Sequence, residues 1–150
     1  MANIHEGGCV CGAVRYAAHS DPFPVSVCHC TWCQRRTGSG FAVEALFEKS
    51  EISVTGTTST FRSNSDESGR WLDLEFCPKC GTNIGFTLER LPDHRMIDSG
   101  TFDDPSWINL DRFEFRYVYL RSAQCWSEIP LGVQAFDAFF PPYTGLSVDP

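Results

Sequence analysis

Seven of the eight cysteines in this chain fall into three close sets, and their spacing is the strongest chemical signal in the sequence. The sets are Cys9 with Cys11, Cys28 with Cys30 and Cys33, and Cys77 with Cys80. Thiolates grouped in this way are typical ligands of a tetrahedral zinc ion. Disulfides are disfavoured, because bridging cysteines so close in sequence introduces strain and because we expect a reducing compartment.

The segment FCPKCGT (76–82) has the spacing of a zinc knuckle, in which two thiolates three positions apart flank a tight turn. Gly81 permits the positive φ that such a turn needs. A redox pair is the alternative, but it would be expected to open a helix within an α/β pattern, and the sequence shows no such pattern. The segment GGCVCGAV (7–14) supplies the other half of a closed, structural site. The expected ligands are Cys9, Cys11, Cys77 and Cys80.

The segment CHCTWC (28–33) then provides three thiolates, which leave one position of a tetrahedral zinc for chemistry. We favour water or a substrate thiol in that position. A site closed by an unidentified ligand, or never metallated, is the alternative. Cys125 and His29 are the candidates for a fourth protein ligand. Cys125 has the features of a buried core cysteine, and His29, between two ligands, is expected to face away from the metal. The predicted catalytic ligands are Cys28, Cys30 and Cys33.

Polar residues follow the third cysteine of this set, in QRRTGSGF (34–41). Two adjacent cations, Arg35 and Arg36, would partly offset the charge of a zinc–thiolate centre and attract a substrate carboxylate. A solvated arginine pair is the alternative. We predict that Arg35, together with Gln34 and Phe41, binds substrate. Asp103–Asp104 resembles an acid–base pair, but turn and capping duty is favoured.

The composition indicates one globular domain, 1–150, with 42% hydrophobic residues. The net charge of −7 disfavours both a nucleic-acid footprint and binding to an anionic membrane. The first residues lack the pattern of a secretory signal, and no stretch approaches the ~18 apolar residues of a membrane span. We therefore expect a cytoplasmic protein with neither nucleic-acid nor membrane partners.

Short segments of alternating apolar and polar residues predict a mainly β fold with antiparallel sheets and few short helices. The predicted strands are 13–18, 24–30, 40–47, 51–56, 59–63, 71–77, 83–89, 95–102 and 113–120. Short helices are expected after Cys30, ending at Gly38, and at 104–110, with Asp104 as the cap and Pro105 at the first position. The segment PLGVQAFDAFFPPY (130–143) is expected to be a short helix or an irregular wrap, ended by Pro141–Pro142.

Taken together, these motifs resemble the family of glutathione-dependent formaldehyde-activating enzymes. The matching segments are GGCVCGAV, CHCTWCQRRTG, FCPKCGT and GTFDDP, spread over about residues 5–130. The resemblance leaves 131–150 as a C-terminal extension and implies an Mss4-like fold with two zinc ions. By position, the resemblance makes one zinc structural and the other catalytic.

The resemblance implies a carbon–sulfur lyase that joins a small thiol, glutathione or similar, reversibly to formaldehyde or another small carbonyl compound. Coordination to zinc would deprotonate the thiol. Two other functions remain open: a zinc-stabilised protein-binding module without enzymatic activity, and a thiol redox sensor. The Phe-rich segment QAFDAFFPPY is a candidate surface for a protein partner, for capping the core, or for a homodimer.

Overall fold

The computed structural model describes residues 3–66 and 68–139, and within them the chain is mainly β, as predicted. The strands are β1 His5–Gly8, β2 Arg15–Ala18, β3 Val25–Cys28, β4 Ala42–Glu48, β5 Ile52–Thr55, β6 Ser59–Asn64, β7 Trp71–Phe76, β8 Asn83–Leu88, β9 Leu91–Asp98, β10 Phe115–Val118 and β11 Gln134–Ala135. The α-helix is α1 Thr31–Thr37, and the 3-10 helices are η1 Lys49–Glu51, η2 Ser99–Thr101, η3 Pro105–Trp107 and η4 Leu120–Ser122. No helix in these ranges is long and apolar enough to cross a bilayer.

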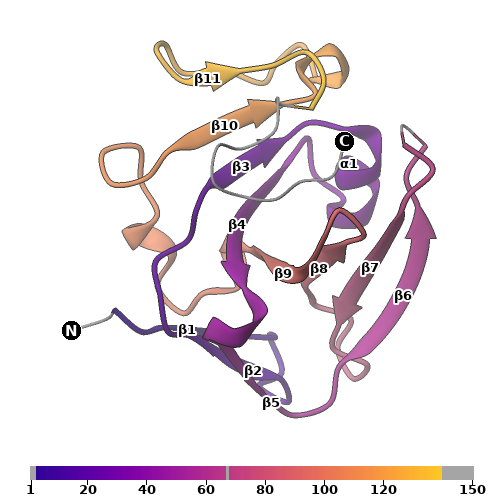
Figure 1. Ribbon diagram of the computed structural model, residues 1–150, viewed down its shortest axis with the longest axis vertical. Helices are drawn as coiled ribbons and strands as arrows, with labels where there is room; N and C mark the ends of the chain where they lie inside the picture. Colours follow the sequence, from indigo (N-terminus) through magenta and orange to yellow (C-terminus); the bar gives the residue numbers. More distant parts are fainter. Residues whose placement is uncertain (1–2, 67, 140–150) are drawn as a thin grey trace.

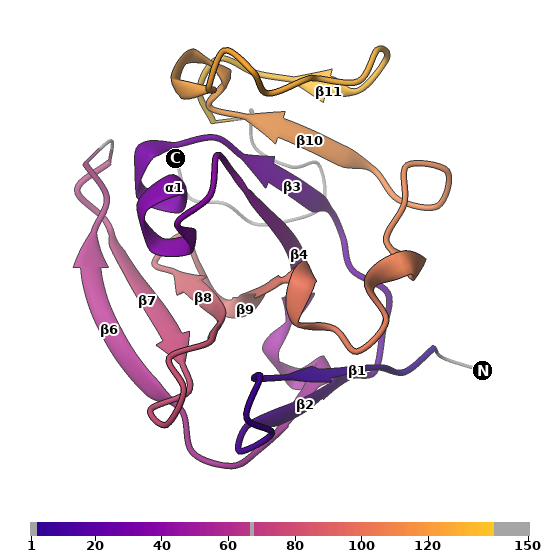
Figure 2. The same ribbon diagram turned by 180° about the vertical axis from the view of Figure 1, so that it is seen from behind.

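The strands form two sheets. The large sheet has the order β11-β10-β3-β4-β9-β8-β7-β6, and the small sheet has the order β1-β2-β5. Most neighbours are antiparallel, but β10 runs parallel to both β3 and β11. Figures 1 and 2 show the large sheet curving from β10 round to β6, with α1 lying inside the bend. This curvature creates the space in which the three-cysteine set lies.

Strand β4 lies in the middle of the large sheet and is buried on both faces, so it divides the interior in two. Its alternate residues point to opposite sides, as in any strand. Ala45 and Phe47 pack in one core, together with two cysteines of the four-cysteine set. Ala42 packs on the other face with Cys28 and Cys33. The two thiol sets therefore belong to different cores on opposite faces of one strand.

The local structure departs from the sequence prediction in three places. The strand predicted at 95–102 is β9, which begins earlier, at Leu91, and ends at Asp98, where the 3-10 helix η2 follows. Strand β1 was not predicted, because its sequence HEGG contains two glycines and has low β propensity; it forms by pairing with β2 and by a bridge to Phe102. The segment 130–139 contains no helix but carries the short strand β11, which extends the sheet beside β10. The remainder of the expected tail, including Pro141–Pro142, lies outside the described residues.

Both predicted helices are present, one after Cys30 and one after Asp104. Helix α1 ends at Gly38, whose φ of 65° and backbone N–H to Gln34 O form the C-cap. The second helix is the single 3-10 turn η3, in which Pro105 occupies the first turn and Asp104 accepts a hydrogen bond from Ser106 N. Asp103 instead pairs with Arg15. The predicted capping role is thus observed for Asp104, whereas the side chain of Asp103 forms an ion pair.

Candidate metal centres and the cavity beside them

The four-cysteine set is assembled from two turns, each closed by a glycine in a left-handed conformation. Cys9 follows β1, and Gly12, at φ 77°, donates its N–H to Cys9 O at 3.0 Å. Cys77 follows β7, and Gly81, also at φ 77°, donates to Cys77 O at 2.8 Å. The two turns place all four Sγ atoms within 4.8 Å of one another. The set therefore ties the small sheet to strand β7 of the large sheet.

The spacing of the sulfurs suits a metal rather than a disulfide. Sγ of Cys11 lies 3.5 Å from that of Cys9 and 3.8 Å from that of Cys77. A tetrahedron of thiolates with zinc–sulfur bonds of about 2.3 Å has edges of about 3.8 Å, whereas a disulfide is about 2.05 Å long. All eight cysteines are free thiols. The residues present thus fit a closed zinc site.

The three-cysteine set is built where β3 runs into α1. Cys28 ends the strand, Cys30 is the N-cap of the helix, and Cys33 lies in its first turn. Sγ of Cys30 accepts a hydrogen bond from Cys33 N at 3.3 Å. The Sγ atoms of all three lie within 4.8 Å of one another. Because the helix N-terminus directs backbone N–H groups at the sulfurs, it favours the thiolate form.

Crowding of these thiols separates their pKa values. The Cys28 thiol, followed by that of Cys33, lowers the pKa of Cys30 to about 3. Contact with the Cys30 thiol raises the pKa of Cys28 well above the ordinary value, and contact with the Cys28 and Cys30 thiols does the same for Cys33; burial acts in the same direction on both. Three negative sulfurs therefore do not coexist without a nearby positive charge, which a metal ion would supply. This set also fits zinc.

Neither candidate for a fourth protein ligand joins the three thiols. The ring of His29 is buried, and its Nε2 hydrogen bonds with Ser127 Oγ at 3.1 Å. Cys125, expected in the core, is instead exposed, because it lies in the loop after η4 rather than in a strand. Within the described ranges, the cluster comprises three cysteines and no additional His, Asp or Glu. Three protein ligands with one position for water or substrate is the usual pattern of a catalytic zinc.

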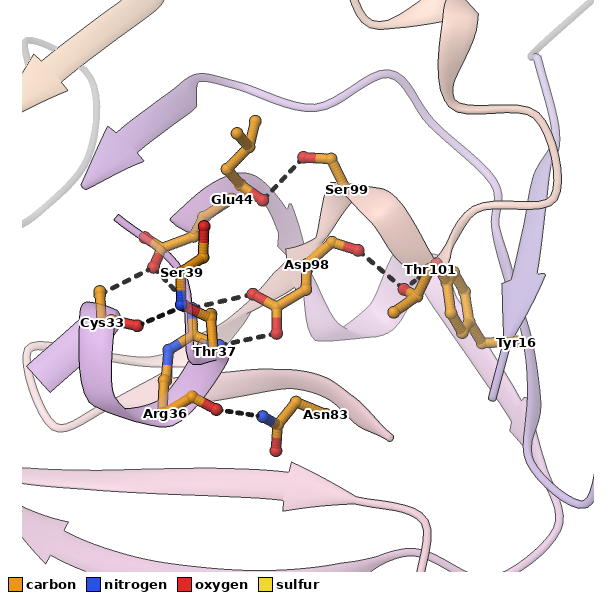
Figure 3. A network of polar contacts seen from close by, with 11 residues as sticks. Tyr16, Cys33, Arg36, Thr37, Ser39, Glu44, Asn83, Asp98, Ser99 and Thr101 are labelled. Carbon is orange, nitrogen blue, oxygen red and sulfur yellow. Dashed lines mark hydrogen bonds and ion pairs between the residues drawn. The ribbon is translucent and has the colours of Figure 1, made fainter. Parts of the chain in front are cut away.

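A buried network of charges adjoins the three thiols (Figure 3). Sγ of Cys33 donates to Oε1 of Glu44 at 3.2 Å, and the same oxygen accepts from Arg36 at 2.7 Å. Arg36 also makes two hydrogen bonds to Asp98, at 2.7 and 2.8 Å. The side chains of Arg36 and Glu44 are only 3% and 4% exposed. Burial raises the pKa of Glu44 to about 7, although Arg36 acts in the opposite direction.

A cavity of about 140 Å³ opens beside this centre. The three cysteines and Glu44 line one part of it, and its walls are mostly apolar. The apolar and aromatic wall residues are Trp32, Trp71, Leu72, Phe86, Leu88, Met96, Val118, Tyr119 and Phe139. Exposed residues such as Thr31 and Ser68 also line the cavity, so it reaches the surface. A small molecule from solvent can therefore approach the thiols.

The residues predicted to bind substrate lie outside this cavity. Arg35 is exposed, on a different side of α1 from Arg36, because successive residues of a helix are about 100° apart. The Gln34 amide donates to the carbonyls of His29 and Ser122, at 2.8 and 2.9 Å. Phe41 packs near the ring of His29, with centroids 5.3 Å apart. Substrate contact by Gln34, Arg35 and Phe41 stays a prediction.

The sequence reasoning missed several residues of the cavity. Glu44 was hidden in a predicted strand, and Arg70, Trp71 and Arg90 lie far in sequence from the three-cysteine set. Tyr119 gave no signal either, although it has a backbone φ of 58°, in the left-handed region that non-glycine residues rarely adopt. Such strain concentrates at functional sites and costs roughly 1–3 kcal/mol.

Comparisons with known proteins agree with this geometry. Residues 4–117 match the sequence profile of the glutathione-dependent formaldehyde-activating enzymes. A Halomonas elongata protein that carries the name of this family is 29% identical over 92 residues, which cover 59% of this chain and 59% of that protein. An uncharacterised lyase of Schizosaccharomyces pombe is 28% identical over 107 residues, 71% of this chain and 74% of its own.

A solved structure supports the fold. The crystal structure of a Rhodobacter sphaeroides protein superposes with a TM-score of 0.51, covering 87% of this chain and 98% of that one. The two sequences are 16% identical, so the similarity concerns the fold.

Proposed function

Because the chain belongs to the family of glutathione-dependent formaldehyde-activating enzymes, we propose that it is a zinc-dependent carbon–sulfur lyase. Its substrates are a small thiol, glutathione or similar, and a small carbonyl compound such as formaldehyde, which it joins reversibly. Two zinc ions per chain are proposed, one structural and one catalytic. A reducing compartment such as the cytoplasm would keep their thiol ligands free of disulfides.

The observation that supports this proposal most directly is the position of the three thiols at a cavity that opens to solvent. A closed structural site has no need of such a cavity. The four-cysteine set, by contrast, has a complete set of thiolate ligands. This difference favours an enzyme over a binding module that is only stabilised by zinc.

The reaction requires a thiol to become a thiolate and then meet a carbonyl carbon. Zinc, when bound by Cys28, Cys30 and Cys33, supplies the positive charge that lowers the pKa of a substrate thiol. The thiolate sulfur donates an electron pair to the carbonyl carbon, the C=O π pair moves to oxygen, and oxygen takes up the proton that the thiol released. The product is a hydroxyalkyl thioether, and the reverse sequence cleaves it. No oxidant or reductant is consumed.

The chain's own residues orient and shield the reactants. The apolar side chains of Trp32 and Phe86 make part of the cavity wall less polar than water, which strengthens the electrostatic contacts beside it. Oε1 of Glu44 lies 3.2 Å from Sγ of Cys33, so contact with this buried carboxyl group positions the sulfur. Holding thiol and carbonyl together in a confined space lowers the entropic barrier to their reaction.

Two measurements on the purified protein test the proposal. Elemental analysis with no added metal should find two zinc ions per chain. Incubation with glutathione and ¹³C-formaldehyde, followed by exchange NMR, should show faster interconversion of aldehyde and thioether than the uncatalysed reaction. Full activity and full zinc in a Cys33→Ala variant would refute the proposal.

A further inference from the structure

Arg90 lies in the wall of the cavity and has no ion-pair partner in the part of the chain that the structure describes. It lies in the turn between β8 and β9, and its Nε is buried without a hydrogen-bond partner. Its guanidinium carbon lies 5.8 Å from the centroid of the Phe139 ring. No hydrogen bond or ion pair joins the Arg90 side chain to any residue of the described ranges.

Two other arginines have a buried Nε without a partner, and the comparison is informative. Arg36 is held by Glu44 and Asp98, and Arg95 by Glu75 at 2.8 Å. Each of these cations therefore has a carboxylate partner within the fold. Among the described residues Arg90 has no such partner, although its Nε is buried and a buried polar atom without a hydrogen bond is costly. An anion that enters the cavity would complete its contacts.

The acidic residues that line the cavity do not meet this need. Glu44 is already paired with Arg36. Asp66 and Glu89 are exposed, so water screens their charges. Arg70, the other cation of the lining, already has interactions within the protein. Arg90 is thus the group best placed to bind a negatively charged part of a substrate, and Arg binds carboxylates in a planar, two-point geometry.

The rest of the cavity fits an apolar group of defined size. Its volume is about 140 Å³, and an apolar cavity of about 150 Å³ holds one benzene molecule. Two indole rings, Trp32 and Trp71, and the phenyl ring of Phe86 contribute to its walls. Formaldehyde has two heavy atoms and would leave most of this space unfilled.

We propose that the carbonyl substrate is an oxo acid with an apolar body of about the size of a six-membered ring, and that Arg90 binds its carboxylate. Arg90 is then a specificity-determining residue, which favours carbonyl acids over formaldehyde. The assignment of this ligand as the carbonyl component rests on the proposed function. The binding of this ligand to Arg90 does not depend on the proposed function.

The test measures binding of phenylglyoxylate, an aromatic 2-oxo acid, to the zinc-loaded protein in the absence of any thiol. Calorimetry, or the fluorescence of Trp32 and Trp71, reports the dissociation constant. We expect Arg90→Gln to weaken binding at least tenfold, because hydrogen bonds to charged groups contribute about 1.5–3 kcal/mol. Arg90→Lys, which keeps the positive charge, should weaken the binding of phenylglyoxylate less than Arg90→Gln does. Benzaldehyde, which lacks the carboxylate, should bind equally to wild type and Arg90→Gln.

The matched control is Arg112→Gln, in an exposed loop outside the cavity lining, which should bind phenylglyoxylate like wild type. Equal binding by wild type, Arg90→Gln and Arg90→Lys, or no binding by wild type, would overturn the proposal. Catalysis of formaldehyde exchange without phenylglyoxylate binding would leave the proposed function standing and reject the role of Arg90. Binding of phenylglyoxylate that depends on Arg90, without catalysis on any thiol, would support the role of Arg90 and reject the proposed function.

Discussion

Sγ of Cys33 and Oε1 of Glu44 lie 3.2 Å apart inside the protein, and the thiol donates a hydrogen bond to the carboxylate. The contact joins the first turn of α1 to the centre of the large sheet. The same carboxylate oxygen accepts from Arg36, which is anchored in turn by Asp98. The position of one proposed metal ligand, Cys33, is therefore coupled to a buried charge network that extends to the end of β9.

Replacing Cys33 should empty the catalytic site without unfolding the protein. We expect Cys33→Ala to retain one zinc ion per chain, since the four-cysteine set belongs to a different core. Thioether exchange should fall by more than about 100-fold, because losing even the hydrogen-bond partner of a metal ligand costs 10–100-fold. Elemental analysis measures the zinc content, and exchange NMR on the same preparation measures the rate of thioether exchange.

The control for that experiment is Cys125→Ala. Cys125 is exposed and belongs to neither cysteine cluster, so zinc content and activity should equal those of wild type. Loss of zinc in this variant would assign Cys125 as a ligand and contradict the present placement.

Replacing Cys80 should instead destabilise the whole fold. The four-cysteine set ties the turn after β1 to the turn after β7, and zinc binding by such sets contributes roughly 10–16 kcal/mol in small zinc domains. We expect Cys80→Ala to lower the melting temperature strongly and a chelator to produce the same effect in wild type. Circular dichroism during thermal unfolding would check this. An unchanged melting temperature would show that this zinc does not stabilise the fold.

Removing Arg36, the cation of the buried network, should lower the free energy of unfolding. In Arg36→Met, Glu44 and Asp98 lose their shared partner, and breaking a buried ion pair from one side typically costs about 3–5 kcal/mol. Urea denaturation of the zinc-loaded protein measures the change. Arg62→Met is the matched control: its pair with Asp73 is more exposed, and such pairs contribute less than about 1 kcal/mol. Equal losses in the two variants would contradict the buried network.

Tyr16 should make stability fall at alkaline pH. Burial raises the pKa of its phenol well above the ordinary value of 10.0, and its hydroxyl hydrogen bonds with Thr101 Oγ1 at 2.8 Å. Above pH 10 the phenol therefore ionises in the unfolded chain and stays protonated in the folded one. The stabilisation is complete below pH 10 and declines above it, by up to about 1.4 kcal/mol per pH unit.

The comparison variant is Tyr16→Phe, which should be less stable at neutral pH by about 1 kcal/mol for the lost hydrogen bond. Its free energy of unfolding should decline less steeply than that of wild type above pH 10. Parallel curves for the two proteins would mean that Tyr16 ionises equally in the folded and unfolded chains.

The features that depend on a few neighbouring residues could be predicted from the sequence. Turns that carry Cys77 and Gly81 are local structures, so the spacing of cysteine and glycine is enough to indicate a metal knuckle. Strands such as β7 follow from alternation, and the end of α1 follows from the glycine at position 38. The resemblance of the motifs indicated the family, which residues 4–117 confirm.

The burial and the partners of each polar side chain depend on the tertiary structure. Arg35 and Arg36 were indistinguishable in sequence, yet one is exposed and the other is held between two carboxylates. Glu44 reaches the thiols because β3 and β4 pair with Cys28 opposite Ala42, a register that depends on the whole sheet. Arg90 reaches the same cavity because the sheet curves.

What the sequence by itself determined is the pair of thiol sets, because zinc ligands come from short segments whose geometry is fixed by local turns. What only the tertiary structure decided is the surroundings of those sets: the buried carboxylate beside Cys33 and the cation of Arg90 in the cavity wall. Such contacts join residues distant in the chain, and they arise from strand register and sheet curvature, which are properties of the whole fold.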